Sequence, residues 1–311
     1  MTDQRLDTLK AWLETFFDDA DFVISKASDD ASFRRYFRIE RSNTTFIAMD
    51  APPTKEDSAP FVQIATLLRN NKIHAPKIIE ADLTQGFLLI EDLGSTTFLQ
   101  ALNHTFNLDL YKSAIDELIK IQAINPKNQD LKQYDDKLLN TEMQLLIDWY
   151  LDKNLNKNQQ AQLHHIFKLL TDNALNSPQV FVHRDYHARN LMLSPANTLA
   201  VIDFQDAVIG SYTYDLCSLL KDAYFELKST DIQTLLAYFY KQANIQINFK
   251  EFEKEFDLMG LQRHLKILGI FKRLSIRDGK HQYLEDIPLV KKYALQIANK
   301  YSEFSFLKEI L

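Results

Sequence analysis

The chain has 311 residues, of which 46% are hydrophobic and 25% are charged, and its formal net charge is −6. This length suggests two domains or lobes, and the acidic balance excludes a chain-wide basic surface that would favour nucleic acid as a partner. The N-terminal segment lacks the layout of a signal peptide, and no run of about 18 apolar residues predicts a transmembrane helix. We therefore expect a cytoplasmic protein with no membrane partner.

The first 92 residues predict a helix followed by a small, mostly antiparallel sheet. Leu6, Leu9 and Leu13 recur at helical spacing near the N-terminus. The segment FRRYFRIERSNTTFIAMDAP predicts two strands around the turn RSNT, and the segments KIIEAD and GFLLIEDLG predict two more. The period of SAPFVQIATLLRNN places one helix between the two pairs. We therefore expect residues 1–92 to form an N-terminal nucleotide-binding lobe.

Residues 93–311 have mainly helical periodicity, interrupted by a short group of strands. Helices are expected over residues 96–104, 107–124, 136–152 and 157–176. Strands are expected in the segments QVFV, NLML and LAVIDF, after which helical patterns continue to the C-terminus. Together the two halves predict an α+β chain of two lobes, the second mainly helical.

The densest group of polar side chains lies in the segment VFVHRDYHARNLML, residues 180–193. Asp185 follows the first strand, Asn190 begins the second, and Asp203 ends the third. A hairpin of the second and third strands would bring Asn190 and Asp203 together, so that all three side chains meet at one end of a small sheet. Phosphoryl transfer from ATP needs one carboxylate to accept a hydroxyl proton and further oxygen ligands to hold Mg²⁺. The three side chains therefore indicate a phosphoryl-transfer site.

The same segment allows a second interpretation. His183, Asp185 and His187 alternate along the chain, so on an extended strand they would share one face and could bind zinc or iron. That interpretation leaves Asn190 and Asp203 without a role. The phosphoryl-transfer interpretation leaves His187 without one.

The motifs HRDYHARN and VIDFQDAVIGSYTYDLCSLLKD resemble the catalytic and metal-binding segments of the aminoglycoside phosphotransferase and choline kinase family. The resemblance implies a protein-kinase-like fold and the cofactors ATP and Mg²⁺. It implies that Asp185 is the catalytic base and that Asn190 and Asp203 bind the metal. His183 would brace the catalytic loop, and Asp215 would tie a helix to it.

Segments across nearly the whole chain resemble one branch of this family, the bacterial kinases of cell-wall amino sugars. Among them are SDDASFRRYFR, LLIEDLG and LMGLQRHLKILGIFKRLSIRDGK. The resemblance implies ATP-dependent phosphorylation of the anomeric hydroxyl of N-acetylmuramate or N-acetylglucosamine. It also implies a pathway link, without a complex, to a sugar-1-phosphate nucleotidyltransferase. Two alternatives stay open: a kinase for another hydroxyl (tRNA-modification-linked, aminoglycoside or choline-like), and a pseudokinase that binds nucleotide without turnover.

The segments expected to bind ATP depart from the usual kinase pattern. The strand FIAMDAP has no lysine and the next helix has no glutamate, although kinases pair these two residue types. The six glycines of the chain also form neither GxGxxG nor GxxxxGK[ST]. We expect SDDASFRRYFR to bind the phosphates instead, through Ser28, Ser32, Arg34 and Arg35. The sequence does not decide which arginine does so.

Two further groups of residues are expected to contact the substrates. The adenine edge would be bound, as the resemblance implies, by backbone groups where the lobes join, at Glu91, Asp92 and Leu93. In the acceptor site, Arg263 and His264 offer donors for a sugar carboxylate, and Trp149 offers an aromatic surface. The other cations of RHLKILGIFKRLSIRDGK, Lys266 among them, are expected to form a solvated helix face.

Overall fold

The computed structural model describes residues 3–28, 33–126, 131–151, 155–194 and 198–311. The chain divides into two compact units, the first with residues 1–96 and 192–205 and the second with residues 97–191 and 206–311. The sequence predicts a single division after residue 92. The structure divides the chain slightly later and adds the segment 192–205 to the first unit.

The first unit contains a five-stranded antiparallel sheet in the order β1–β2–β3–β5–β4. Its strands are β1 (Val23–Ser28), β2 (Arg35–Arg41), β3 (Thr44–Asp50), β4 (Ile78–Asp82) and β5 (Phe87–Glu91). Ser42 and Asn43 connect β2 to β3 with positive φ angles of 47° and 62°, as a tight hairpin turn requires. The sequence predicts these two strands and the β4–β5 pair. It misses β1, an edge strand whose Val23 side chain is exposed.

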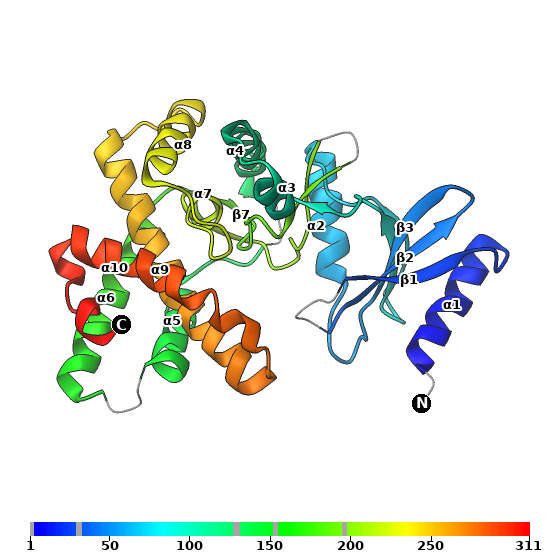
Figure 1. Cartoon of the computed structure of the whole chain (residues 1–311), viewed down its shortest axis with the longest axis horizontal. Helices are drawn as coiled ribbons and strands as arrows, with labels where there is room; N and C mark the ends of the chain where they lie inside the picture. The colour runs from blue at the N-terminus through cyan, green and yellow to red at the C-terminus, as the bar shows by residue number, and fades with distance from the viewer. Residues whose placement is uncertain (1–2, 29–32, 127–130, 152–154, 195–197) are drawn as a thin grey trace. The chain divides into compact units, whose positions relative to one another are not determined.

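Helix α1 (Gln4–Phe17) lies beside this sheet (Figure 1) and covers one of its faces. Leu9 and Leu13 are fully buried and pack with Ile39 and Phe87 of the sheet. The helical spacing of the leucines therefore predicts the buried side of α1 correctly.

The second unit is mainly helical, and its longest element is the thirty-residue helix α9 (Phe249–Asp278) (Figure 1). Its other helical segments are α3 (Phe98–His104), α4 (Leu108–Gln122), α5 (Asp136–Leu145), the π-helix η2 (Leu146–Tyr150), α6 (Lys157–Asn176), α7 (Tyr214–Leu220), α8 (Ser229–Gln242), η3 (His281–Leu284), α10 (Ile287–Lys300), η4 (Ser302–Phe304) and α11 (Leu307–Ile310). Helices α5, α6 and α10 contact α9, and buried Leu163, Leu265 and Val290 lie in their common core. None of the described helices combines the length and the apolar character needed to cross a membrane.

The short strands form two separate sheets. Strand β7 (Gln179–Val182) pairs with β10 (Val208–Ser211), whereas β6 (Thr96–Thr97), β8 (Leu191–Leu193) and β9 (Leu199–Val201) form a sheet in the order β6–β8–β9. The prediction that β7 shares one sheet with β8 and β9 is therefore wrong. All four residues of β10 are buried, and so short an apolar run does not distinguish a strand from part of a helix.

Candidate active site

Carboxylates on α7 and just after it anchor the loop between β7 and β8. Asp215, in the first turn of α7, accepts hydrogen bonds from the backbone N–H groups of His183 (2.6 Å) and Arg184 (3.0 Å). Asp222 accepts one from the N–H of Ala188 (2.9 Å). Burial raises the pKa of Asp215 to about 7 and that of Asp222 to about 6. The loop is thus tied to one buried element at two separate points.

Contacts inside the loop fix the backbone of Asp185. The N–H of Asp185 donates to Nδ1 of His183 (3.2 Å), and Nδ2 of Asn190 donates to the carbonyl oxygen of Asp185 (3.1 Å). Arg184 has a φ of 75°, which is unfavourable for a residue with a long side chain. The hydrogen bonds to Asp215 stabilise this conformation, so the carboxylate of Asp185 projects from a constrained backbone.

A buried charge network connects α5 and α9 to the same loop. Glu142 of α5 forms ion pairs with Arg184 and with Lys266 of α9, the latter at 3.0 Å. The hydroxyl of Tyr134 also donates to Glu142, and Nζ of Lys266 donates to the hydroxyl of Tyr214 (3.1 Å). Burial lowers the pKa of Lys266, but the charge of Glu142 more than offsets this effect and holds that pKa above its ordinary value. Lys266 is therefore a charged side chain beside the loop.

A cavity of about 140 Å³ lies in the second unit, and Asp185 and Lys266 are part of its wall. Other residues of the wall include His187, Tyr224, Arg263 and Phe271. Burial disfavours the charged form of Asp185, but Lys266 and further cations more than offset it and hold the pKa of Asp185 below its usual range. Asp185 is thus ionised at neutral pH, as acceptance of a proton requires.

The structure corrects the expectation that Lys266 belongs to a solvated face of α9. Arg263 and Lys266 are only 3% and 7% exposed, and both line the cavity. Arg263 is thus where the sequence predicts it, whereas the sequence does not predict Lys266 in the acceptor site. The spacing of the two residues could have indicated this position of Lys266, because residues three apart share one side of a helix.

His264 and Trp149, the other two expected acceptor residues, do not line this cavity. His264 is fully buried, its Nε2 lies 3.0 Å from the carbonyl oxygen of Lys221, and its ring stacks on Tyr293. Burial lowers the pKa of His264 to about 3. Trp149 is half-buried in η2. His264 therefore has a packing environment rather than a binding one.

His187 lines the cavity, but it does not form a metal site with His183 and Asp185. Its side chain is buried, and burial lowers its pKa to about 3. His183 directs Nδ1 to the backbone of Asp185 instead of to a shared ion. Among the residues that the structure describes, no group of three His, Cys, Asp or Glu side chains could hold a metal ion. The geometry therefore does not support the His-Asp-His metal site.

Asp203 lies in the first unit, two residues beyond the end of β9. It has a φ of 62°, and Nε2 of Gln205 donates to its Oδ1 (2.8 Å). The neighbouring Phe204 is fully buried, with its ring 4.9 Å from that of Phe61 in helix α2 (Ala59–Asn70). Packing of Phe204 thus fixes the backbone next to Asp203. Asn190, by contrast, lies in the second unit and immediately precedes β8.

The arginines expected to bind phosphate take part in ion pairs within the first unit. Arg34 is buried and pairs with Glu56 (3.0 Å). Arg35 pairs with Asp50, a fully buried carboxylate at the end of β3. Outside the described parts of the chain lie Ser32 and the side chain of Ser28. Phosphate would therefore compete with carboxylates for these arginines.

The residues expected at the adenine edge follow β5. Glu91 pairs with Arg69 (2.9 Å), and Asp92 accepts hydrogen bonds from Arg38, including one of 2.7 Å from its Nε. Leu93 is buried in a small apolar cluster with Met192 and Ala200 of the same unit. Both acidic side chains are thus occupied with arginines, and Leu93 supplies apolar surface.

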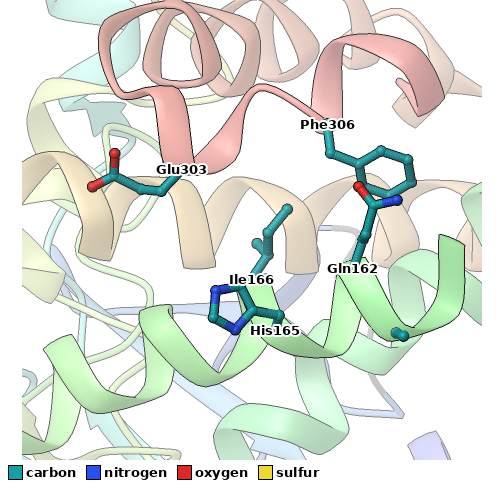
Figure 2. Close-up of a pocket in the computed structure, with 6 residues that line it drawn as sticks. Gln162, His165, Ile166, Glu303 and Phe306 are labelled. Atoms are coloured by element: carbon teal, nitrogen blue, oxygen red, sulfur yellow. The ribbon is translucent and has the colours of Figure 1, made fainter. Parts of the chain in front are cut away.

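A larger pocket, of about 280 Å³, lies between α6 and the C-terminal segment (Figure 2). Figure 2 shows the side chains of Gln162, His165, Ile166, Glu303 and Phe306 around it. None of its lining residues belongs to the loop between β7 and β8, and Glu303 is paired with Lys254 (3.3 Å). We therefore assign no part of the phosphoryl transfer to this pocket.

Solved structures of small-molecule kinases have the same fold. A choline kinase from Streptococcus pneumoniae matches with a TM-score of 0.67 over 94% of this chain and 100% of that chain, at 12% identity. A choline/ethanolamine kinase family protein from Mesorhizobium loti matches with a TM-score of 0.68 over 97% of each chain, at 10% identity. The α+β prediction is therefore confirmed, and the fold is the protein-kinase-like fold that the resemblance of the motifs implies.

Sequence similarity identifies the family. The model of the phosphotransferase enzyme family matches residues 23–244. N-acetylmuramate/N-acetylglucosamine kinases from Pseudomonas putida and Pseudomonas aeruginosa are each 40% identical to this chain, over 99% of it and 96% of their own length. One from Neisseria meningitidis is 36% identical over 99% of this chain and 95% of its own. The chain belongs to the phosphotransferase enzyme family.

Proposed function

We propose that the chain transfers the γ-phosphoryl group of ATP to the anomeric hydroxyl of N-acetylmuramate or N-acetylglucosamine. The observation that carries the proposal is the ionised Asp185 in the wall of a cavity that also presents buried cations and aromatic rings. Such a combination of apolar surface with a few oriented polar groups suits a small polar ligand. The similarity to kinases named for these two sugars supports the choice of acceptor.

Asp185 would orient the attacking hydroxyl and accept its proton. The hydrogen bonds of the loop to Asp215 and Asp222 would keep this carboxylate in place during the reaction. Because phosphoryl transfer requires little covalent chemistry from the protein, most of the rate gain would come from positioning and charge stabilisation.

Asn190 and Asp203 would hold Mg²⁺, which prefers carboxylate and carbonyl oxygen ligands. The donor set fits this ion, since it consists of one amide oxygen and one carboxylate. The hydrogen bond from Nδ2 of Asn190 to the carbonyl oxygen of Asp185 orients the amide. The bound ion would neutralise negative charge on the phosphates of ATP.

ATP would bind in the first unit. The phosphates would be bound by residues at the start of the sheet, namely Ser28, Ser32, Arg34 and Arg35, and the adenine edge by the backbone of residues 91–93.

The reaction would take place in the cytoplasm, where ATP is available, and would serve the recycling of cell-wall sugars. Its product, a sugar 1-phosphate, is the kind of substrate that a sugar-1-phosphate nucleotidyltransferase uses.

Consumption of ATP by the purified protein, with each amino sugar in turn, tests the proposal. We expect at least one sugar to stimulate turnover. Asp185→Asn should lower kcat by about 10²- to 10⁴-fold, the usual contribution of a general base, with little change in the affinity for ATP. The missing lysine on β3 favours a pseudokinase as the second candidate. ATP binding without stimulation by any acceptor would support that candidate and eliminate the sugar kinase.

A further inference from the structure

The guanidinium group of Arg263 lies in the cavity wall, and two of its nitrogens have no hydrogen-bonding partner among the residues that the structure describes. The side chain is 3% exposed. Its Nε and Nη1 atoms are buried, and neither has an acceptor in the parts of the chain that the structure describes. A buried charged donor without an acceptor is unfavourable. Oxygen atoms of a ligand in the cavity would remove this penalty.

The neighbouring cation of the cavity wall, Lys266, differs from Arg263 in this respect. Lys266 has Glu142 and the hydroxyl of Tyr214 as partners. Arg184, which pairs with Glu142, is not part of the wall. Asp185 and Asp222 attract Arg263 through space, which makes a buried cation tolerable but leaves its N–H groups unbonded. Among the described cations of the cavity wall, Arg263 is therefore the one whose buried N–H groups lack acceptors and could bind a ligand.

The charge of these donors indicates the chemical group that they would bind. Guanidinium presents several N–H donors that all carry positive charge, and such donors bind a carboxylate more strongly than they bind a neutral hydroxyl. N-acetylmuramate carries such a carboxylate on a lactyl ether, whereas N-acetylglucosamine has a neutral hydroxyl at that position. We infer that Arg263 binds the carboxylate of an acidic amino sugar, so that N-acetylmuramate is the preferred acceptor. This inference rests on the proposed function and names the substrate class of the same site.

The size and lining of the cavity agree with this assignment. Its volume is about 140 Å³, well above the ~15 Å³ that one water molecule needs on this measure. A short acidic side group therefore fits inside it, with the sugar ring next to that group. Tyr224, Phe271 and Tyr283 form a row of aromatic rings in the cavity wall, with neighbouring centroids 6.2 Å and 5.2 Å apart. They offer an apolar surface to that ring.

The test compares N-acetylmuramate with its methyl ester, which has the same ether but no charge. For the wild type, we expect kcat/KM for the acid to exceed that for the ester by about 10- to 150-fold, the range for a hydrogen bond to a charged group. Arg263→Met should reduce this ratio to about one. Arg277→Met is the matched control, because Arg277 is exposed on the same helix and pairs with Asp278. It should leave the ratio unchanged.

Three results would overturn the inference, and they can be told apart. If Arg263→Met lowers activity with acid, ester and N-acetylglucosamine by one common factor, Arg263 acts on something other than the carboxylate. If the wild type phosphorylates N-acetylglucosamine but does not discriminate acid from ester, the proposed function stands and the inference alone fails. If no amino sugar is phosphorylated, the proposed function fails with it. Should Arg263→Met not fold, Arg263→Lys serves instead, since it keeps the charge but offers fewer N–H donors in another arrangement, and the ratio should fall only in part.

Discussion

Replacement of Glu142 by glutamine tests whether the buried charge network stabilises the second unit. Glu142 is 7% exposed and pairs with Arg184 and, at 3.0 Å, with Lys266. At an effective dielectric constant of about 20, one charge pair at this distance contributes roughly 5 kcal/mol of attraction, part of which desolvation offsets. Removal of one member of a buried pair costs about 3–5 kcal/mol. We therefore expect Glu142→Gln to lower the free energy of unfolding by about that amount.

Urea unfolding near neutral pH measures this loss. Glu303→Gln is the control, because Glu303 pairs with Lys254 at an exposed site, where the expected loss is below about 1 kcal/mol. Glu142→Gln combined with Lys266→Met should cost at least about 1 kcal/mol less than the sum of the single changes, since the two side chains interact. A loss for Glu142→Gln no larger than that of the control, or strictly additive losses, would refute the reasoning.

Two further changes test the packing of α9. His264 is neutral in the fold because burial lowers its pKa to about 3. In the unfolded chain the pKa of His264 is about 6.5, so below that pH unfolding takes up a proton on this side chain. The free energy of unfolding of the wild type should therefore fall by ~3 kcal/mol between about pH 7 and pH 4 because of His264. His264→Phe should flatten that part of a urea-unfolding pH profile, and an unchanged slope would assign the titration to another group. A methyl group at Gly269 would lie 2.3 Å from the backbone carbon of Leu145, so Gly269→Ala should separate α9 from α5 and lower Tm by about 3–10 °C. An unaltered Tm would show that the two helices adjust freely.

Most helices could be predicted from the sequence because burial imposes a period on their apolar residues. Leu9 and Leu13 of α1 illustrate this, since both are fully buried against the sheet. Strand pairing between distant segments leaves no comparable pattern. Strand β10 pairs with β7, yet nothing in four consecutive buried residues indicates the partner, because strands buried on both faces lose their alternation.

In the candidate site, too, some residues could be predicted from the sequence and others could not. The spacing of Asp185, Asn190 and Asp203 is visible in the sequence because local loop and hairpin geometry determines it. Glu142 and Lys266 come from helices far apart in the chain, and only the packing of α5 against α9 brings them together. Neighbouring residues of a helix point in directions about 100° apart, which is why Arg263 lines the cavity and His264 does not.

The position of phosphate on the product tests the central claim most directly. The purified protein is incubated with ATP, Mg²⁺ and N-acetylmuramate, and the product is examined by phosphorus and carbon NMR. We predict coupling between phosphorus and the anomeric carbon, which identifies a sugar 1-phosphate, and we predict that Asp185→Asn forms almost none of it in the same time. A phosphate on any other hydroxyl, or ATP consumption without a phosphorylated sugar, would contradict the assignment of Asp185 and its cavity to anomeric phosphorylation.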